Sequence, residues 1–184
     1  MTAEELKAIA DSNSEHISFE TMLENSTVGG LVLEFGVASG STINEIAKHC
    51  DRVYGFDWFE GLPEHWRDDI SVGSFKCEVP EVLENVELVI GLIQDTIDNF
   101  LKNHPGPVSF VHVDVDIYSA AACILHKLKD RIQSGTVIAF DELIHYGGYE
   151  DHEFKALLEF INETGFEVEC LGARHGEART FRIK

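Results

Sequence analysis

Short apolar runs alternate with amphipathic stretches along most of this chain. Apolar runs of strand length occur at residues 31–35, 52–56, 86–90, 108–113, 136–140, 166–171 and 180–183. Apolar positions at helical spacing predict helices over residues 41–49, 95–101, 119–132 and 151–163. We expect Ser39 or Ser41 to cap the first helix, Asp95 to cap the second, and Gly165 to end the last. Since strands that alternate with helices form a parallel sheet covered on both faces, the pattern predicts an α/β fold.

The end of the chain departs from this alternation. Only residues 172–178 separate the last two expected strands, and so short a link cannot form a parallel crossover. The last strand should therefore run antiparallel beside its predecessor, in a mostly parallel sheet of seven strands. We expect a single domain, in which residues 1–28 form a helical lead-in and residues 29–184 form the core.

Composition narrows the possible partners and the compartment. The 14 basic and 33 acidic residues give a net charge of −19, and such a field repels phosphate backbones and anionic membrane surfaces. We therefore expect neither a nucleic-acid partner nor a membrane partner. No apolar run approaches the length of a transmembrane helix. The four scattered cysteines form no Cys-x-x-Cys pair, which predicts reduced thiols in a cytoplasmic protein.

The first expected strand leads into a turn that contains glycine. Gly36 allows a sharp turn close to a ligand, and Gly40 stands where the next helix begins. Glu34, at the end of the strand, can accept a hydrogen bond from an ammonium group such as that of S-adenosylmethionine, whereas it would repel the pyrophosphate of NAD. Together with Ser39 and Ser41, these residues are candidate cofactor ligands. The alternative is an ordinary tight turn between a strand and a helix.

Two later turns supply further candidates for binding a nucleoside. Asp57 ends the second strand 21 residues after Gly36, a position from which an acidic side chain can hydrogen-bond ribose hydroxyls. Trp58 follows it and is a further candidate. In the loop after the third strand, Gln94 or Asp95 can receive an adenine amino group, although Asp95 can instead cap the next helix. Together these features predict a nucleoside site.

Acidic side chains follow both central strands. Asp114 and Asp116 come after the fourth strand and Asp141 and Glu142 after the fifth, so they should meet at one rim of the sheet. Converging carboxylates are unfavourable unless a cation or protons neutralise them, and oxygen ligands suit Mg²⁺ or another hard divalent cation. Such an ion can lower the pKa of a bound hydroxyl. The alternative role for Asp116, shared with Ser119, is to cap the following helix.

Histidine and aromatic side chains are expected near the same rim. His145 is a candidate catalytic base for a hydroxyl, while His112 can be a core residue whose hydrogen bonds are satisfied. Trp58, Phe59 and Trp66 can line a cleft for an acceptor or can pack within the segment after the second strand.

These motifs resemble those of the macrocin O-methyltransferase-like family of class I methyltransferases, which methylate sugar hydroxyls on macrolide and aminocoumarin antibiotics. The resemblance spans roughly residues 30–165. The matching stretches are 33–41, 55–64, 91–96, 112–119 and 141–142. The Phe-Glu-Gly-Leu-Pro and Asp-x-Asp-x-Tyr-Ser elements within them are far more specific than the glycine turn.

The resemblance implies a Rossmann-like fold, S-adenosylmethionine as methyl donor, and a Mg²⁺ ion held by Asp114, Asp141 and Glu142. Asp114 is also a candidate base in such enzymes and a candidate cofactor ligand. Family members commonly have Asp-Asp where this chain has Asp141-Glu142. They also have more sequence before the first strand and a lid over the acceptor, so the acceptor site here is expected to be open or completed by a second subunit of a homodimer.

The expected activity is methyl transfer to a hydroxyl of a small molecule with the help of a divalent cation, and the resemblance implies a sugar as that molecule. The alternatives are methylation of nitrogen on a small molecule, an NAD-dependent oxidoreductase, and a non-catalytic module that keeps the cofactor pocket.

Overall fold

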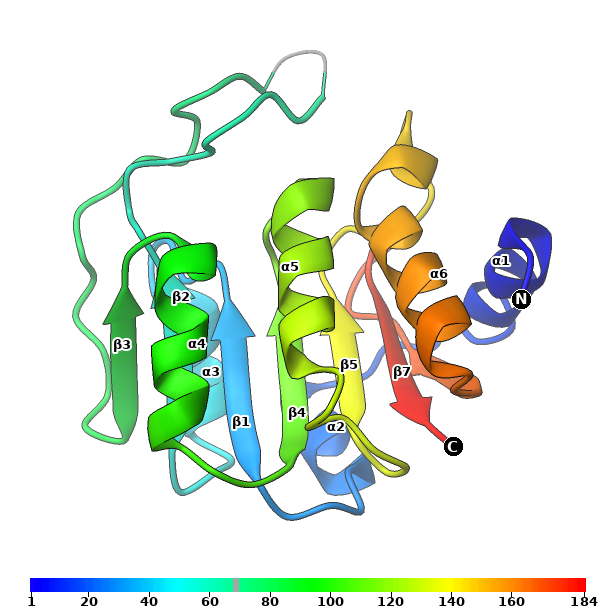
Figure 1. Cartoon of the computed structure of the whole chain (residues 1–184), viewed down its shortest axis with the longest axis horizontal. Helices are drawn as coiled ribbons and strands as arrows, with labels where there is room; N and C mark the ends of the chain where they lie inside the picture. The colour runs from blue at the N-terminus through cyan, green and yellow to red at the C-terminus, as the bar shows by residue number, and fades with distance from the viewer. Residues whose placement is uncertain (68–69) are drawn as a thin grey trace.

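A seven-stranded sheet runs through the centre of the molecule (Figure 1). The computed structural model describes residues 1–67 and 70–184. The strands are β1 (Leu31–Phe35), β2 (Val53–Asp57), β3 (Val86–Ile90), β4 (Val108–Val113), β5 (Val137–Phe140), β6 (Val168–Gly172) and β7 (Arg179–Ile183), in the spatial order β3-β2-β1-β4-β5-β7-β6. β1 to β5 pair in parallel, and β7 runs antiparallel to both β5 and β6. The expected mostly parallel sheet with an antiparallel last strand is confirmed.

Helices cover both faces of this sheet. They are α1 (Ala3–Ala10), α2 (Phe19–Asn25), α3 (Ser41–Ala47), α4 (Ile93–Asn103), α5 (Tyr118–Leu128) and α6 (Glu153–Thr164), with a short 3-10 helix at Tyr149–Asp151. In Figure 1, α4, α5 and α6 lie side by side in front of the sheet, while α2 and α3 lie behind it. α1 packs against β6 at the far edge.

Two apolar layers, one on each face, hold the helices to the sheet. In the layer under α4, α5 and α6, the rings of Phe35 and Phe56 stack 4.5 Å apart, and Phe100 of α4 meets Phe56 edge-on. In the layer under α2 and α3, Phe19 meets Phe110 of β4 edge-on. Complete burial of an aromatic side chain of this size contributes about 1.5–3 kcal/mol. The central strands are almost continuously apolar because both of their faces are covered.

The start of α3 differs from expectation. A capping side chain requires an extended backbone at the position before the helix, but Gly40 occupies that position with a left-handed φ of 79°. No side chain caps this helix, and the hydroxyls of Ser39 and Ser41 lie 3.3 Å from each other. The prediction that one of these serines caps α3 is therefore wrong.

Other helix boundaries also shift by a few residues. α4 begins at Ile93, so Asp95 lies inside the first turn, where the helix dipole favours it, and does not cap the helix. Neither Asp116 nor Ser119 caps α5, which ends four residues earlier than expected. α6 ends as expected at Gly165, whose left-handed backbone donates its N–H to the carbonyl of residue 161.

The long segment between β2 and β3 rises above the carboxyl ends of the strands (Figure 1). Its described part contains no helix or strand. Leu62 closes it into a loop, because its N–H donates to the carbonyl of Ser74 and its carbonyl accepts from the N–H of Gly73. Within the described residues, none of the helices has both the length and the apolar character that crossing a membrane requires.

Candidate active site

A cavity of about 450 Å³ opens at the carboxyl ends of the parallel strands. The turns after β1 to β5 and the loop above the sheet form its walls, and its size suits a ligand of several tens of atoms. Five of the predicted cofactor ligands line it, namely Gly36, Asp57, Trp58, Gln94 and Asp114. The other five, Glu34, Ser39, Gly40, Ser41 and Asp95, are not part of its wall.

Gly36 brings the turn after β1 against the end of β4. Its φ is +91°, and a Cβ atom added there would lie 1.7 Å from the carbonyl oxygen of Asp114. Two adjoining strand ends can approach this closely only because the residue has no side chain. The turn and the first acidic residue after β4 therefore form one rigid piece of the cavity wall.

Asp57 holds the same turn from the other side. One of its oxygens, Oδ2, accepts hydrogen bonds from the N–H groups of Val37 and Ala38, at 2.9 and 2.8 Å. The other oxygen, Oδ1, accepts from the N–H of Phe59 at 2.7 Å. A carboxylate offers about four acceptor positions, so about one stays available to a ligand hydroxyl. Asp57 is thus a structural clasp of the cavity wall as well as a candidate ribose ligand.

Three carboxyl groups converge on the cavity. Oxygens of Asp114, Asp116 and Glu142 lie within 4.8 Å of one another, and we call these residues the carboxylate cluster. Oε2 of Glu142 is buried and has no hydrogen-bond partner. Burial, reinforced by the neighbouring negative charges, raises the pKa of Asp114 to about 8, of Asp116 to about 7 and of Glu142 to about 9. The cluster therefore holds protons near neutral pH or requires a cation.

Asp141, a predicted metal ligand, sits differently from its neighbour Glu142. Its Oδ1 atom lies 3.8 Å from Nε2 of His112 and 3.3 Å from Nε2 of His175. Burial alone would raise the pKa of Asp141, but these two imidazoles outweigh it and lower the pKa to about 2. Asp141 also approaches Asp114 in a group with His112. The structure thus brings Asp114 and Glu142 together with Asp116 and places Asp141 beside the cluster.

Glu34 and His112 form a buried pair behind the cavity. Glu34 is 0% exposed, and its Oε1 atom lies 3.0 Å from Nδ1 of His112. Burial would lower the pKa of His112, but the neighbouring carboxylates of Asp141 and Glu34 raise it to about 10. The imidazolium therefore neutralises acidic groups on both of its sides. The predicted contact between Glu34 and a cofactor ammonium has no counterpart in this arrangement, because Glu34 is enclosed by protein.

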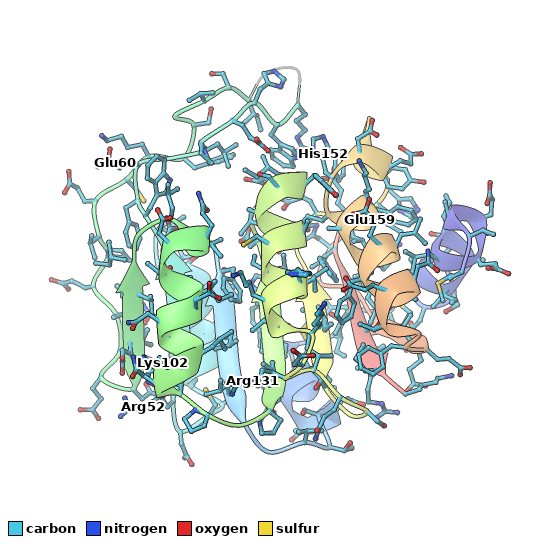
Figure 2. All side chains as sticks on the ribbon, viewed as in Figure 1. Arg52, Glu60, Lys102, Arg131, His152 and Glu159 are labelled. Carbon is cyan, nitrogen blue, oxygen red and sulfur yellow. The ribbon has the colours of Figure 1, made fainter. Side chains whose placement is uncertain are left out.

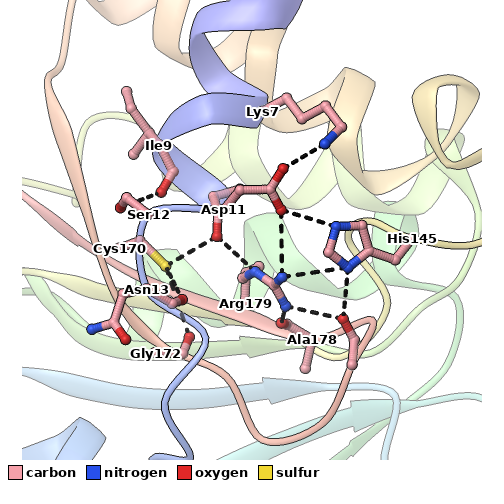
Figure 3. A network of polar contacts seen from close by, with 12 residues as sticks. Lys7, Ile9, Asp11, Ser12, Asn13, His145, Cys170, Gly172, Ala178 and Arg179 are labelled. Atoms are coloured by element: carbon pink, nitrogen blue, oxygen red, sulfur yellow. Dashed lines mark hydrogen bonds and ion pairs between the residues drawn. The ribbon is translucent and has the colours of Figure 1, made fainter.

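His145, the predicted base, lies outside the cavity. Its Nε2 atom is 2.9 Å from Oδ1 of Asp11, and its Nδ1 atom is 3.3 Å from the carbonyl oxygen of Gly176 (Figure 3). The side chain belongs to a network with Lys7 of α1 and Arg179 of β7. The structure therefore does not bring His145 together with Asp114.

Two aromatic residues and an arginine of the loop above the sheet form part of the cavity wall. Trp58 and Trp66 line it, whereas Phe59 packs in the apolar layer under α2 and α3. The guanidinium of Arg67 lies 3.9 Å from the Trp66 ring and 3.3 Å from Oε2 of Glu177. Its charge faces the carboxylate cluster and opposes the rise in the pKa of Asp116 and Glu142. No sequence pattern indicates Arg67, because its position depends on a loop without periodicity.

Glu153, the first residue of α6, is a second residue of this region that the sequence pattern does not indicate. It is fully buried, and its Oε1 atom accepts a hydrogen bond from the N–H of Val115 at 3.2 Å. Burial raises its pKa well above the usual range, and the charges of Asp116 and Glu142 add to the rise. Glu153 therefore holds the backbone between the two aspartates of the cluster.

Comparisons with known proteins agree with this geometry. A family described as "Methyltransferase domain" matches residues 33–143, more than half of the chain. No curated protein matches significantly. Among solved structures, the calicheamicin methyltransferase CalS11 is 20% identical, with a TM-score of 0.73 over 89% of this chain and 76% of its own. The O-methyltransferase NovP is 18% identical, with a TM-score of 0.66 over 89% and 77%. SMU.1697c, a putative methyltransferase from Streptococcus mutans in complex with SAH, is 13% identical, with a TM-score of 0.56 over 100% and 99%.

The solved structures share the fold, and the family match spans the part of the chain that forms the cavity. It runs from β1, through the clasp at Asp57, to the residue after Glu142. The resemblance stated from the sequence is thereby confirmed. The chain belongs to the methyltransferase domain family and is an S-adenosylmethionine-dependent methyltransferase of the Rossmann-like class I fold.

Proposed function

We propose that this enzyme transfers the methyl group of S-adenosylmethionine to a hydroxyl oxygen of a small molecule. The observation behind the proposal is one cavity whose wall contains both the nucleoside candidates, Asp57 and Gln94, and the carboxylate cluster. A hydroxyl gives up its proton reluctantly, whereas a neutral amine attacks a methyl group without losing one first. A hydroxyl acceptor therefore provides a chemical reason for acidic groups beside the cofactor.

In the proposed reaction, the hydroxyl oxygen attacks the methyl carbon in line with the carbon–sulfur bond. That bond breaks as the oxygen–carbon bond forms, S-adenosylhomocysteine leaves, and the proton of the hydroxyl passes to Asp114 or Asp116. A carboxylate within reach of the attacking oxygen is a suitable proton acceptor. The walls contribute alignment and exclude water, with Trp66 and Leu62 on the apolar side.

The carboxylate cluster fits a divalent cation. Its ligands are oxygens only, they lie within 4.8 Å of one another, and Oε2 of Glu142 is buried without a partner. We propose that Asp114, Asp116 and Glu142 hold Mg²⁺, with Asp141 adjoining them. When bound, such an ion lowers the pKa of a hydroxyl that reaches it.

A sugar hydroxyl is the acceptor that we favour. One structure of CalS11 is described as that of a TDP-rhamnose 3'-O-methyltransferase, and the sequence resembles enzymes that act on sugars. We propose the cytoplasm as the compartment, since all four cysteines are free thiols. The homodimer stays a prediction.

The test is methyl transfer from radiolabelled S-adenosylmethionine to a panel of sugars, sugar nucleotides, polyphenols and amines, with Mg²⁺ and after removal of metal by EDTA. We expect a hydroxyl to be methylated, and we expect both EDTA and Glu142→Gln to lower the rate at least about 100-fold. Glu84→Gln, at an exposed position before β3, is the matched control and should keep the wild-type rate. Methylation of an amine at a rate indifferent to EDTA would contradict the proposal.

A further inference from the structure

A second hollow, of about 330 Å³, lies at the same rim of the sheet as the cavity. β5 ends at Phe140, opposite Arg179 at the start of the antiparallel strand β7. The loop before β7, residues 173–178, therefore emerges at the carboxyl ends of the parallel strands, beside the loop that follows β5. The segment after α1 completes the wall of this hollow.

Five of the eight residues that line the hollow are basic, although the chain as a whole is strongly acidic. They include Arg174, Arg179 and three of the nine histidines, His16, His145 and His175, and they include no aspartate or glutamate. We call these five residues the basic hollow. A net charge of −19 repels anions at long range, so a local concentration of positive charge is needed wherever an anion is to bind.

One arginine of the basic hollow is fixed rigidly in place. Arg179 is 2% exposed, and its Nε and Nη1 atoms donate to the carbonyls of Ala10 and Gly176, at 2.7 and 3.0 Å. Asp11 lies 3.7 Å from Nη2 of Arg179 and also contacts Lys7 and His145 (Figure 3). A single carboxylate thus faces two permanent positive charges and an imidazole, which leaves this side of the hollow short of negative charge.

The other arginine has its charge still available to a ligand. The guanidinium of Arg174 lies 4.0 Å from the ring of Phe19, a contact that orients it without neutralising it. Among residues 1–67 and 70–184, Arg174 forms no ion pair with a carboxylate. A planar guanidinium presents paired donors that match the oxygens of a phosphate or carboxylate. A metal ion fits less well, because two guanidinium groups repel it and, within the described residues, His16, His145 and His175 belong to no group whose ligand atoms converge.

The basic hollow adjoins the carboxylate cluster. Nε2 of His175 lies 3.3 Å from Oδ1 of Asp141, and Asp141 directly precedes Glu142 of the cluster. A ligand that places a hydroxyl at the cluster can thus extend along the rim toward the hollow. We propose that the basic hollow binds an oxyanion, a phosphate or diphosphate, that the methyl acceptor bears. This inference rests on the proposed function for the acceptor, but the binding of the oxyanion can be measured without catalysis.

The first experiment is calorimetric titration of the protein with inorganic pyrophosphate. We expect the wild-type protein to bind it and Arg174→Gln to weaken the binding at least about tenfold, the loss of one charge-assisted contact. Arg52→Gln is the matched control, because Arg52 lies at the opposite end of the strands (Figure 2). Equal affinity in the wild type and Arg174→Gln, or no binding by the wild type, would overturn the inference.

The second experiment asks whether the acceptor bears the anion. Uridine diphosphate glucose and glucose are titrated in the same way, and uridine diphosphate glucose should compete with pyrophosphate while glucose should not. If pyrophosphate binds but uridine diphosphate glucose does not compete, the hollow is a site for a free anion and the assignment to the acceptor is wrong. Titration with S-adenosylhomocysteine separates the two proposals, since its affinity should be unchanged in Arg174→Gln. If the wild-type protein does not bind S-adenosylhomocysteine, the methyl-transfer proposal is contradicted, whereas the result for pyrophosphate is unaffected.

Discussion

Asp57 offers the sharpest test of how the cavity is built, because one carboxylate accepts three backbone hydrogen bonds there. In Asp57→Ala the N–H groups of Val37, Ala38 and Phe59 lose their acceptor. A hydrogen bond to a charged group contributes about 1.5–3 kcal/mol, but Ala38 is exposed and water can replace the carboxylate at its N–H. We therefore expect Asp57→Ala to lower the free energy of unfolding by about 2–4 kcal/mol.

The conservative variant Asp57→Asn separates the contribution of the hydrogen bonds from that of the negative charge. In Asp57→Asn the amide oxygen can still accept from two of the N–H groups, while the amide nitrogen faces the third. The expected loss is about 1 kcal/mol, so the three proteins should rank wild type, Asn and Ala. For a chain of this length, 1 kcal/mol corresponds to about 2–4 °C in Tm. Asp57→Ala should thus melt about 4–16 °C below the wild type.

The assay is thermal unfolding by circular dichroism, with calorimetric titration of S-adenosylhomocysteine on the same samples. Asp51→Ala is the matched control, since Asp51 is exposed and precedes β2. Both variants of Asp57 should bind the nucleoside more weakly, and Asp57→Ala should show no measurable binding. A Tm of Asp57→Ala within 1 °C of the control, with binding lost, would refute the idea that the carboxylate holds the turn in the free protein, because such a shift corresponds to at most about 0.5 kcal/mol.

Three further predictions follow from the geometry of the rim. Gly36→Ala should destabilise the fold by more than about 2 kcal/mol, because its φ is +91° and the new Cβ would meet the carbonyl oxygen of Asp114. Gly29→Ala is the control and should have the Tm of the wild type, because a Cβ atom added there has no other atom within 4 Å. Gln94→Ala should weaken S-adenosylhomocysteine binding about tenfold while Asp95→Asn should not, because only Gln94 lines the cavity; equal losses in calorimetry would contradict this assignment. Without metal, the free energy of unfolding should fall as pH rises from 5 to 9. The pKa of Glu142 is about 9 in the folded state and near 4.5 in the unfolded state, so the folded state holds an extra proton in this window. The pKa of His112, raised to about 10 from 6.5, changes stability in the same direction. Added Mg²⁺ should then raise Tm more at pH 8 than at pH 6, and an equal rise at both would count against metal binding by the carboxylate cluster.

The mostly parallel sheet and its antiparallel last strand follow from the hydrophobic pattern, whereas several site residues do not. Strands buried on both faces appear as continuous apolar runs, and the short link before β7 requires an antiparallel partner. The caps of α3 and α4 could not be predicted, since they depend on the left-handed backbone of Gly40 and on two extra helical residues before Asp95. Propensity describes which residues favour a cap and leaves the local backbone undetermined.

The sequence predicted that the acidic residues lie at one rim of the sheet, but it did not predict which of their side chains contact one another. Asp141 and Glu142 are consecutive, so their side chains diverge, and only Glu142 reaches the cavity. Asp116 joins the cluster because its backbone adopts a left-handed φ of 65°, which no pattern of apolar residues indicates. His145 was misplaced for a different reason: its partner Asp11 comes from the other end of the sequence. Such long-range pairs are visible only once the sheet has brought both segments to one rim.

The layout of charge along this rim explains how a chain with a net charge of −19 tolerates so many buried acids. Glu34 and Asp141 flank one imidazole, His112, whose raised pKa keeps it positive at neutral pH. That pairing leaves Asp114, Asp116 and Glu142 as the acids of the cavity whose charge is least compensated. The charge of Arg67 opposes those of Asp116 and Glu142, and His112 opposes that of Asp114. A buried carboxylate without a counter-charge is strongly unfavourable, so these three retain protons when nothing else is bound. An ion or a substrate hydroxyl that replaces these protons gains a favourable contact with the carboxylates at this point of the rim. In the proposed binding mode, the hydroxyl of the acceptor lies at the carboxylate cluster, and its oxyanion extends away from the nucleoside wall to the basic hollow.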